Sequence, residues 1–274
     1  MRNIKTDRRM NSNTSVVLND LSIGYRYKQG TRVVAEHVTA SIQRGCLTCL
    51  LGENGVGKST LLKTLSAFLP KLSGSILIEG RDLEQYNERE RARTIGIVLT
   101  EKPDVQQMTV MELVEMGRVP YTGFWGRLHE DDKKACEEAI NLIDITHLKD
   151  RMVQTLSDGE RQKVMIAKAL AQQTPIIYLD EPTAFLDYPS KVDMLLLLSR
   201  ISKEAQKTVF LSTHDLELAL QVADTVWLMT RTDGIQIGTP HELAKNGILS
   251  QFIERSKEIS FDKNTLSVRV DVAY

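Results

Sequence analysis

The sequence predicts an α/β fold, a mostly parallel sheet whose two faces are covered by helices. Short apolar runs of strand length alternate with helical patterns in the C-terminal half, at residues 176–179, 190–205, 208–212, 216–223 and 225–229. This alternation is typical of parallel strands joined by crossover helices. With 274 residues and 42% hydrophobic content, the chain can bury one substantial core, or one core and a smaller subdomain.

A small antiparallel sheet is expected near the start of the chain. Short strand patterns occur at residues 16–18, 21–23, 32–35 and 37–42, and the sequence Lys-Gln-Gly at 28–30 is a turn signal between them. Further short strands are predicted at residues 76–78 and 95–99. We therefore expect this small sheet to lie against the main core.

Helical periodicity replaces the strand signal over about residues 100–170, with helices predicted at 110–116, 131–143 and 161–171. We interpret this stretch as a helical subdomain inserted into the α/β core. One domain is thus expected over residues 15–240, followed by a C-terminal tail, 241–274, that is helical to about Ser256.

Composition excludes several classes of protein. The formal net charge is −1, from 35 Lys and Arg and 36 Asp and Glu, so we expect no nucleic-acid partner. No apolar segment follows the basic residues 1–10, so no secretory signal is expected. The longest apolar run, residues 194–198, is too short to cross a bilayer.

Three cysteines, Cys46, Cys49 and Cys136, are an odd number that fits a reducing compartment. The spacing of Cys46 and Cys49 also occurs in redox and metal pairs. These two cysteines lie in an apolar run that ends at a glycine loop, without a second Cys or His pair. We interpret the run as a buried strand.

The glycine loop and its flanking elements form a phosphate-binding pattern. Residues 52–60, Gly-Glu-Asn-Gly-Val-Gly-Lys-Ser-Thr, match the Walker A pattern between a strand at 46–51 and a helix at 58–67. Glycines let backbone N–H groups turn toward phosphate oxygens, and the start of a helix attracts anions. We predict that Lys58 reaches the β- and γ-phosphates of ATP and that the Ser59 hydroxyl binds Mg²⁺. The expected nucleotide contacts are Gly52, Asn54, Gly55, Gly57, Lys58, Ser59 and Thr60.

Two carboxylates, Asp180 and Glu181, follow the apolar strand 176–179. The carboxyl ends of parallel strands are where α/β sheets bind ligands. Asp180 suits Mg²⁺, partly through water, and Glu181 suits polarisation of an attacking water. Adjacent carboxylates are costly without a cation, and a magnesium nucleotide supplies one.

Three more segments complete an ordered set: residues 156–162 (Leu-Ser-Asp-Gly-Glu-Arg-Gln), 185–187 (Phe-Leu-Asp) and 211–215 (Leu-Ser-Thr-His-Asp). Ser157 with Glu160 would by itself be only a capping box at the start of a helix. Together with the Walker A loop and the Asp-Glu pair, the set resembles the ATP-binding cassette (ABC) family of transporter ATPases from about residue 15 to 240.

The resemblance implies a nucleotide sandwich made by two copies of the chain. Ser157 and Gly159 of one copy would meet the γ-phosphate on the Walker A loop of the other, and Asp187 would communicate across the dimer. His214 would contact the γ-phosphate and act with Glu181 in catalysis. Tyr25 is the residue expected to stack on adenine, with Tyr27 as the alternative.

Within the family, residues 108–121 and 214–224 are similar to ATPases of importers for ferric siderophores, haem and vitamin B12. This likeness implies a peripheral subunit on the cytoplasmic face of the inner or plasma membrane. Its partners would be membrane permease subunits and, indirectly, a substrate-binding protein. The alternative is a soluble ABC ATPase of cofactor (iron–sulfur) assembly. A regulatory module without turnover is disfavoured by the presence of Glu181 and His214.

The sequence departs from the family pattern at two places. Thr100 stands where the family usually has a glutamine that touches Mg²⁺ and water, and Glu101, Gln106 and Gln107 are nearby candidates for that role. In the signature segment, Asp158 and Glu160 replace the usual glycine and glutamine. Because extra negative charge near a γ-phosphate is unfavourable, our hypothesis is that Asp158 caps the helix and faces solvent.

Overall fold

The computed structural model describes residues 13–100, 105–123, 125–256 and 258–271. Its centre is a six-stranded sheet in the order β10-β9-β3-β8-β7-β6, and all neighbours pair in parallel except β10 with β9. The strands are β3 (Leu47–Gly52), β6 (Ile95–Val98), β7 (Ile176–Asp180), β8 (Thr208–Ser212), β9 (Thr225–Thr230) and β10 (Gly234–Gly238). The predicted α/β class with a mostly parallel sheet is confirmed.

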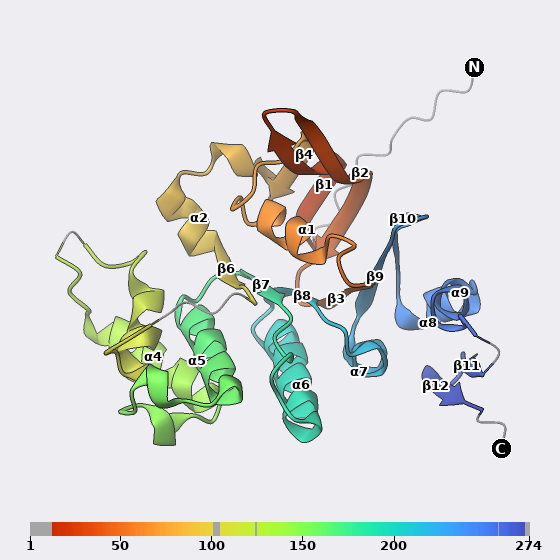
Figure 1. Cartoon of the computed structure of the whole chain (residues 1–274). Coiled ribbons are helices and arrows are strands. Elements are labelled where there is room, and N and C mark those ends of the chain that lie inside the picture. Colours follow the sequence, from red (N-terminus) through yellow and green to blue (C-terminus); the bar gives the residue numbers. More distant parts are fainter. Residues whose placement is uncertain (1–12, 101–104, 124, 257, 272–274) are drawn as a thin grey trace.

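Helices cover both faces of this sheet, as Figure 1 shows: α1 (Lys58–Leu65) lies on one side, and α5 (Asp158–Ala171), α6 (Tyr188–Glu204) and α7 (Leu216–Val222) lie on the other. Every residue of β7 is buried. Ile177 and Leu179 belong to the hydrophobic cluster on the α6 side, whereas Tyr178 packs in the cluster that contains α1. Burial on both faces explains why the strand reads as a continuous apolar run.

An antiparallel sheet in the order β2-β1-β4-β5 lies beside the core. It comprises β1 (Thr14–Tyr27), β2 (Gly30–Gln43), β4 (Ser73–Ile78) and β5 (Arg81–Asp82). The prediction of four short strands at 16–42 was wrong in detail, because they form two long strands. The apparent breaks are irregularities in the register of the two strands. At these places Asp20 and His37 have positive φ angles of 51° and 56°, and His37 Nδ1 lies 2.7 Å from Asp20 Oδ1.

The inserted helices are α3 (Val110–Glu115), α4 (Glu130–Leu142) and α5, which begin and end close to the predicted bounds. They follow β6 and precede β7, as predicted. Short 3₁₀ turns lie at Met116–Arg118, Thr146–Leu148 and Val153–Thr155 within this region, and at Leu83–Gln85 before α2 (Glu88–Thr94).

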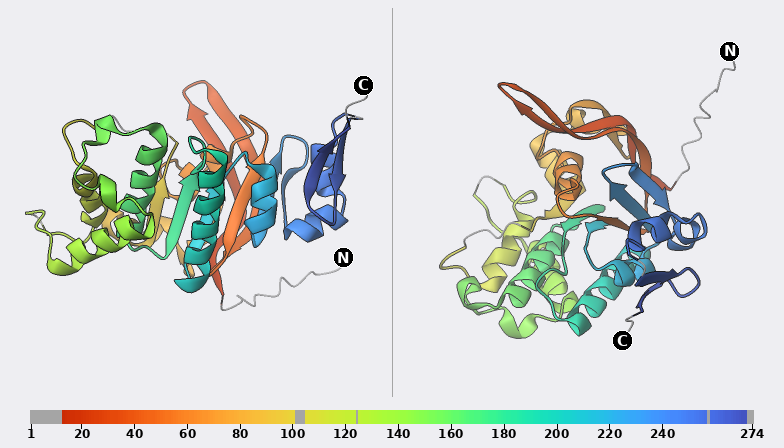
Figure 2. Two further views of the ribbon diagram at one scale, coloured as in Figure 1. Left: turned by 90° about the horizontal axis from the view of Figure 1, so that it is seen from below. Right: turned by 45° about the vertical axis from the view of Figure 1, so that its right-hand side comes forward.

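The tail forms α8 (Pro240–Lys245), α9 (Ile248–Ile253) and a hairpin of β11 (Ile259–Asp262) and β12 (Ser267–Val270). Sequence patterns predicted the helices of the tail but not its hairpin. Outside the tail, they also did not predict α2 and β10. Leu249 and Phe261 belong to the same hydrophobic cluster as the central sheet. Figure 2 shows the helical subdomain and the tail at opposite ends of the molecule. The domain limits 15–240 and 241–274 stay a prediction.

Cys49 is fully buried in β3, and burial raises the pKa of its thiol to about 12. Cys46 is partly buried just before that strand. Among the helices of the described ranges, none combines the length and apolar character that a membrane crossing requires.

Candidate nucleotide-binding site

The Walker A segment links β3 to α1 and presents its lysine inward. Lys58 is 5% exposed, and its Nζ donates to the carbonyl oxygens of Gly52 and Glu53 at 2.9 and 3.0 Å. Burial lowers the pKa of this ammonium, and the charges of Glu181 and Asp180 oppose the shift. Gly57 has a φ of 121°, and a Cβ there would lie 2.1 Å from Val34 Cγ1, so only glycine fits at the start of α1.

A cavity of about 660 Å³ lies in front of this loop. Its walls come from both sheets: the antiparallel sheet supplies Tyr25, Arg32, Val33 and Val34, residues 54–60 form the floor, and Glu181, His214 and Arg231 close the other side. The cavity therefore brings together the predicted Asn54, Gly55, Gly57, Lys58, Ser59 and Thr60 with Tyr25, Glu181 and His214. Gly52 lies at the end of β3 behind the loop.

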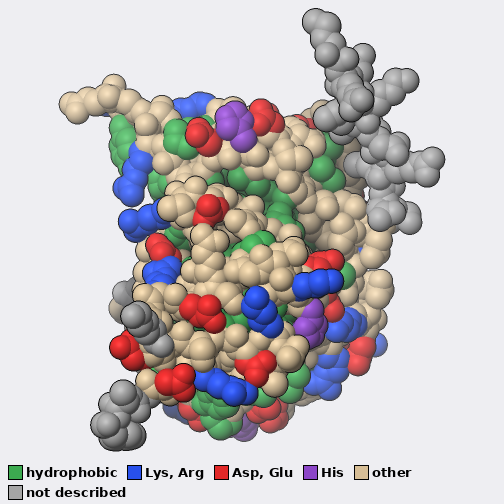
Figure 3. All heavy atoms as spheres, turned by 90° about the vertical axis from the view of Figure 1, so that its right-hand side faces the viewer, with side chains coloured by type: hydrophobic (Ala, Val, Ile, Leu, Met, Phe, Trp, Pro, Cys, Tyr) green, Lys and Arg blue, Asp and Glu red, His purple; other side chains and the backbone are tan. Residues whose placement is uncertain are grey.

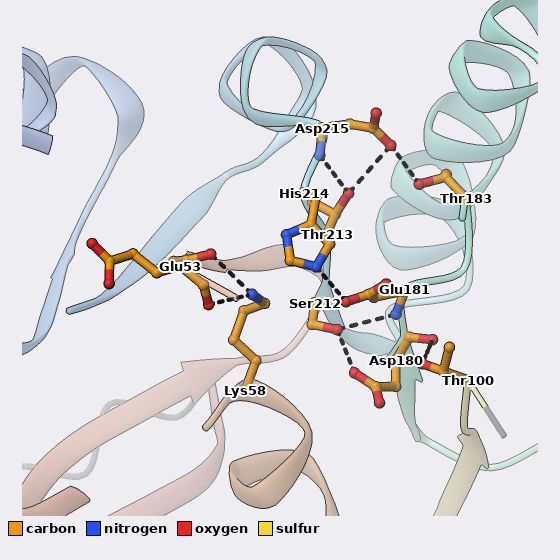
Figure 4. A network of polar contacts seen from close by, with 11 residues as sticks. Glu53, Lys58, Thr100, Asp180, Glu181, Thr183, Ser212, Thr213, His214 and Asp215 are labelled. Carbon is orange, nitrogen blue, oxygen red and sulfur yellow. Dashed lines mark hydrogen bonds and ion pairs between the residues drawn. The ribbon is translucent and has the colours of Figure 1, made fainter. Parts of the chain in front are cut away.

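Glu181 and His214 contact each other in the wall of this cavity (Figure 4), with Oε1 of Glu181 2.5 Å from Nε2 of His214. The backbone of Glu181 is left-handed, with a φ of 52°. Its N–H donates to the carbonyl oxygen and the hydroxyl of Ser212, at 3.1 and 3.0 Å. These bonds from β8 hold a conformation that a residue other than glycine rarely adopts.

Asp180 is 3% exposed at the end of β7, and its Oδ1 accepts a hydrogen bond of 2.6 Å from the Ser212 hydroxyl. Ser59 lies in the first turn of α1, on the cavity wall. A hydroxyl and a carboxylate are hard oxygen donors of the kind that Mg²⁺ prefers, so these two residues fit the ion.

Thr100 does not line the cavity; its hydroxyl donates to the carbonyl oxygen of Asp180 at 3.1 Å (Figure 4). Gln106 and Gln107 are exposed, and the N–H of Gln107 donates to Gln154 Oε1 at 2.7 Å. Glu101 lies outside the described residues. Thr100, which stands where the family resemblance led us to expect a glutamine, thus contacts the backbone of Asp180 and not the cavity.

For adenine, the geometry favours Tyr25 over Tyr27. The Tyr25 hydroxyl lies 3.0 Å from Thr60 Oγ1, and its ring lines the cavity. Tyr27 is 60% exposed and lies outside the cavity lining, with its ring centroid 6.4 Å from that of Tyr25.

The signature residues lie elsewhere on the chain. Ser157 caps α5 in a capping box with Glu160, and a Cβ on Gly159 would lie 3.3 Å from the carbonyl oxygen of Phe185. Asp187 caps α6 by accepting from the Ser190 N–H at 3.1 Å. None of Ser157, Gly159 and Asp187 lines the cavity in front of Lys58. Within one chain, these three predicted residues therefore lie apart from the cavity.

Our hypothesis about Asp158 was wrong in one respect: Ser157, not Asp158, is the capping residue. Asp158 is the first residue of α5 and is exposed, as expected. The Glu160 carboxylate is bound to the N–H and hydroxyl of Ser157, which lower its pKa.

Sequence reasoning missed several residues of the site. Ser212 and Asp215 belong to the segment 211–215 but were given no role of their own, and Asp215 accepts from Thr183 and Lys191, both at 2.8 Å. Their place directly after the strand 208–212 was a usable signal. Arg32 and Arg231 are brought to the cavity only by the tertiary fold, and no local pattern marked them.

Comparison with known proteins agrees with this geometry. The protein family described as ABC transporter matches residues 35–184. The chain belongs to this family, and its fold is the P-loop ATPase cassette.

Two relatives extend the likeness over most of the chain. The ferric enterobactin transport ATP-binding protein FepC of Escherichia coli is 37% identical over 86% of this chain and 84% of its own length. The iron(3+)-hydroxamate import ATP-binding protein FhuC of Bacillus subtilis is 34% identical over 92% of each chain. The solved dimeric structure of MJ0796, a bacterial ABC transporter cassette, has a TM-score of 0.74 at 23% identity, over 82% of this chain and 98% of its own. At that identity it supports the fold alone.

Proposed function

We propose that the protein is the ATP-hydrolysing subunit of an ABC importer that powers uptake of an iron complex, a ferric siderophore or haem, or of cobalamin. Relatives at 37% and 34% identity are named as ATP-binding proteins of ferric enterobactin transport and iron(3+)-hydroxamate import. The observation that supports the mechanism is that Lys58, Glu181 and His214 line one cavity, whereas Ser157, Gly159 and Asp187 lie outside it.

Each chain would then contribute one half of two composite sites. The phosphates of ATP bind Lys58 and the loop N–H groups of one copy, and Ser157 and Gly159 of the second copy cover the γ-phosphate. Asp187 lies on the same surface as these two residues and would contact the partner. This arrangement makes ATP binding and dimer closure one event, and hydrolysis reverses it.

In hydrolysis, Glu181 is the group that accepts a proton from the attacking water. His214 holds the Glu181 carboxylate in place before ATP binds and can turn to the γ-phosphate afterwards. Mg²⁺, held by Ser59 and Asp180, would neutralise phosphate charge. Ser212 fixes the backbone of Glu181 and the carboxylate of Asp180, since it accepts from the Glu181 N–H and donates to Asp180 Oδ1.

The permease contact is proposed for a second cavity, of about 520 Å³, between α2 and the helical subdomain. Its rim carries two large apolar side chains, Phe68 at 65% and Val119 at 61% exposure, and Lys168 lies in its wall. Exposed apolar side chains of this size mark interaction surfaces. A cytoplasmic helix of the permease is the occupant that we propose, which would hold the protein at the cytoplasmic face of the inner or plasma membrane. A substrate-binding protein would act through the permease.

Turnover and oligomeric state test the mechanism together. We expect purified wild-type protein to hydrolyse ATP, and Glu181→Gln to lose turnover and form a stable dimer at saturating ATP and Mg²⁺. Glu204→Gln, an exposed carboxylate at the end of α6, is the matched control and should behave as wild type. A monomeric Glu181→Gln variant with normal ATP binding would contradict the sandwich.

A cellular measurement distinguishes the importer function from the alternative, a soluble ATPase of iron–sulfur assembly. Cells that carry Glu181→Gln should lose uptake of radiolabelled ferric siderophore while their iron–sulfur enzymes stay active under iron supplementation. The reverse outcome would favour the assembly function.

A further inference from the structure

The C-terminal segment reaches the phosphate loop through one side chain. Arg255 follows α9, and its Nη2 lies 2.5 Å from Oε1 of Glu53, the second residue of the Walker A segment. Arg231 lies near the other carboxylate oxygen, with its Nε 3.8 Å from Oε2. The Glu53 carboxylate is thus held between two guanidinium groups, the nearer of which belongs to the tail.

Glu53 also takes part in positioning Lys58. Its carbonyl oxygen accepts a hydrogen bond of 3.0 Å from Lys58 Nζ, while its side chain points away from the lysine (Figure 4). The backbone of Glu53 therefore faces the phosphate site, whereas its carboxylate faces the tail. A carboxylate that swung toward bound phosphates would repel them, and the ion pair with Arg255 keeps it turned away.

The position of Arg255 is fixed by the packing of the tail. Phe261 and Leu266 are buried, and the Phe261 N–H donates to Glu254 Oε1 at 2.8 Å. The Val268 N–H donates to Oε1 of Glu217 at 2.6 Å, and Glu217 lies in the first turn of α7, three residues after His214. The tail thus contacts both the phosphate loop and the helix that follows the histidine.

Figure 3 shows the face of the molecule that carries the tail, where acidic and basic side chains alternate. Charges of both signs are therefore mixed on this face.

We propose that Arg255 is a positioning residue for nucleotide binding: it neutralises Glu53 and helps to hold the phosphate loop in its binding conformation, so that the tail contributes to the affinity for ATP. This inference rests on the proposed nucleotide site and is independent of the transported substrate. The pair is solvent-exposed, with 57% of the Arg255 and 32% of the Glu53 side chain accessible, so its effect is modest.

The test is direct binding of ATP and ADP to the purified full-length protein, measured by calorimetry in the presence of Mg²⁺. We expect Arg255→Ala to weaken ATP binding by about two- to fivefold, the effect of one exposed ion pair, and ADP binding by less. Arg255→Lys should retain most of the affinity. The loss should shrink at high salt, because screening weakens exposed charges.

Two further variants make the inference falsifiable. Arg269→Ala removes a tail arginine that pairs with Asp262 inside the hairpin, and it should leave affinity unchanged. In a Glu53→Gln background, Arg255→Ala should have no further effect, because no charge remains to be neutralised. Equal losses in Arg255→Ala and Arg269→Ala, or a loss that persists in the Glu53→Gln background, would overturn the inference. Absence of ATP binding by the wild type would instead refute the proposed function.

Discussion

Nε2 of His214 lies 2.5 Å from Oε1 of Glu181, and both side chains line the cavity in front of the phosphate loop. The two residues come from the ends of neighbouring parallel strands, β8 and β7. Their contact joins the group that we propose to polarise water to the group that we propose to sense the γ-phosphate.

His214→Ala should lower ATP turnover by about 100-fold or more, because the Glu181 carboxylate loses its partner before ATP binds and the γ-phosphate loses the side chain that would contact it afterwards. ATP affinity should change little, since Lys58 and the loop stay intact. Steady-state turnover and equilibrium binding distinguish these effects. The control is His241→Ala, an exposed histidine in α8. Equal kinetics for the two variants would count against a role for His214.

Two inactive variants should recover ATPase activity when they are mixed. Lys58→Ala disables the phosphate loop, and Ser157→Arg blocks the signature surface. In a mixed dimer both defects fall on one composite site, so the other site is complete. Mixing the two proteins should recover ATPase activity up to about half the level per mixed dimer, whereas each protein alone stays inactive. No recovery, with heterodimers verified by size, would mean that the halves do not act in trans.

Asp158→Gly should leave ATP affinity unchanged within about twofold, because Asp158 is exposed and Ser157 performs the capping. Binding at fixed Mg²⁺ measures this. A variant that binds ATP much more tightly would show that the Asp158 carboxylate faces the phosphates.

The stability of the helical subdomain depends on a buried ion pair. Arg118 Nε donates to Asp132 Oδ1 at 2.9 Å, and both side chains are less than a tenth exposed. Asp132→Ala should cost about 3–5 kcal/mol, since it leaves a buried guanidinium without its partner. Lys133→Ala, which breaks only the exposed pair with Glu130, should cost less than about 1 kcal/mol. Urea unfolding at pH 7 compares the two variants.

Acid should weaken the same pair. The His129 N–H and the Arg118 guanidinium lower the pKa of the Asp132 carboxyl below its ordinary value. A carboxyl with a depressed pKa stabilises the fold above its unfolded-state pKa, and this contribution is lost as the pH falls through the folded-state value. Stability at pH 3 should therefore fall more in wild type than in Asp132→Ala. An identical acid dependence in both proteins would contradict this assignment.

Much of the fold follows from local sequence patterns. The buried strands 176–180 and 208–212 and the amphipathic helices of the insertion carry strong periodic signals, and the Walker A loop fixes the strand and helix around it. The hairpin β11–β12 escaped prediction because Ile259 and Val268 are only partly buried and the strands are four residues long. The long strands β1 and β2 looked interrupted because Asp20 and His37 adopt positive φ angles inside them.

The residues of the candidate site likewise fall into those that the sequence predicted and those that it did not. Lys58, Asp180 and Glu181 could be predicted as site residues because each belongs to a short local sequence pattern. Arg231 and Arg255 were not, because each meets Glu53 only through the folding of distant segments. Thr100 shows the limit of motif comparison, since its hydrogen bond to the backbone of Asp180 is visible only in three dimensions.

The walls of the cavity belong to two layers of the molecule, Tyr25 and Val34 to the antiparallel sheet and Lys58 and Glu181 to the parallel core. A nucleotide in that cavity would contact both layers and hold them together. Its binding free energy would oppose their separation and suppress local opening of β1 and β2. Amide hydrogens in these two strands would then exchange more slowly with solvent deuterium as ATP is added, and their protection would report how fully the site is occupied.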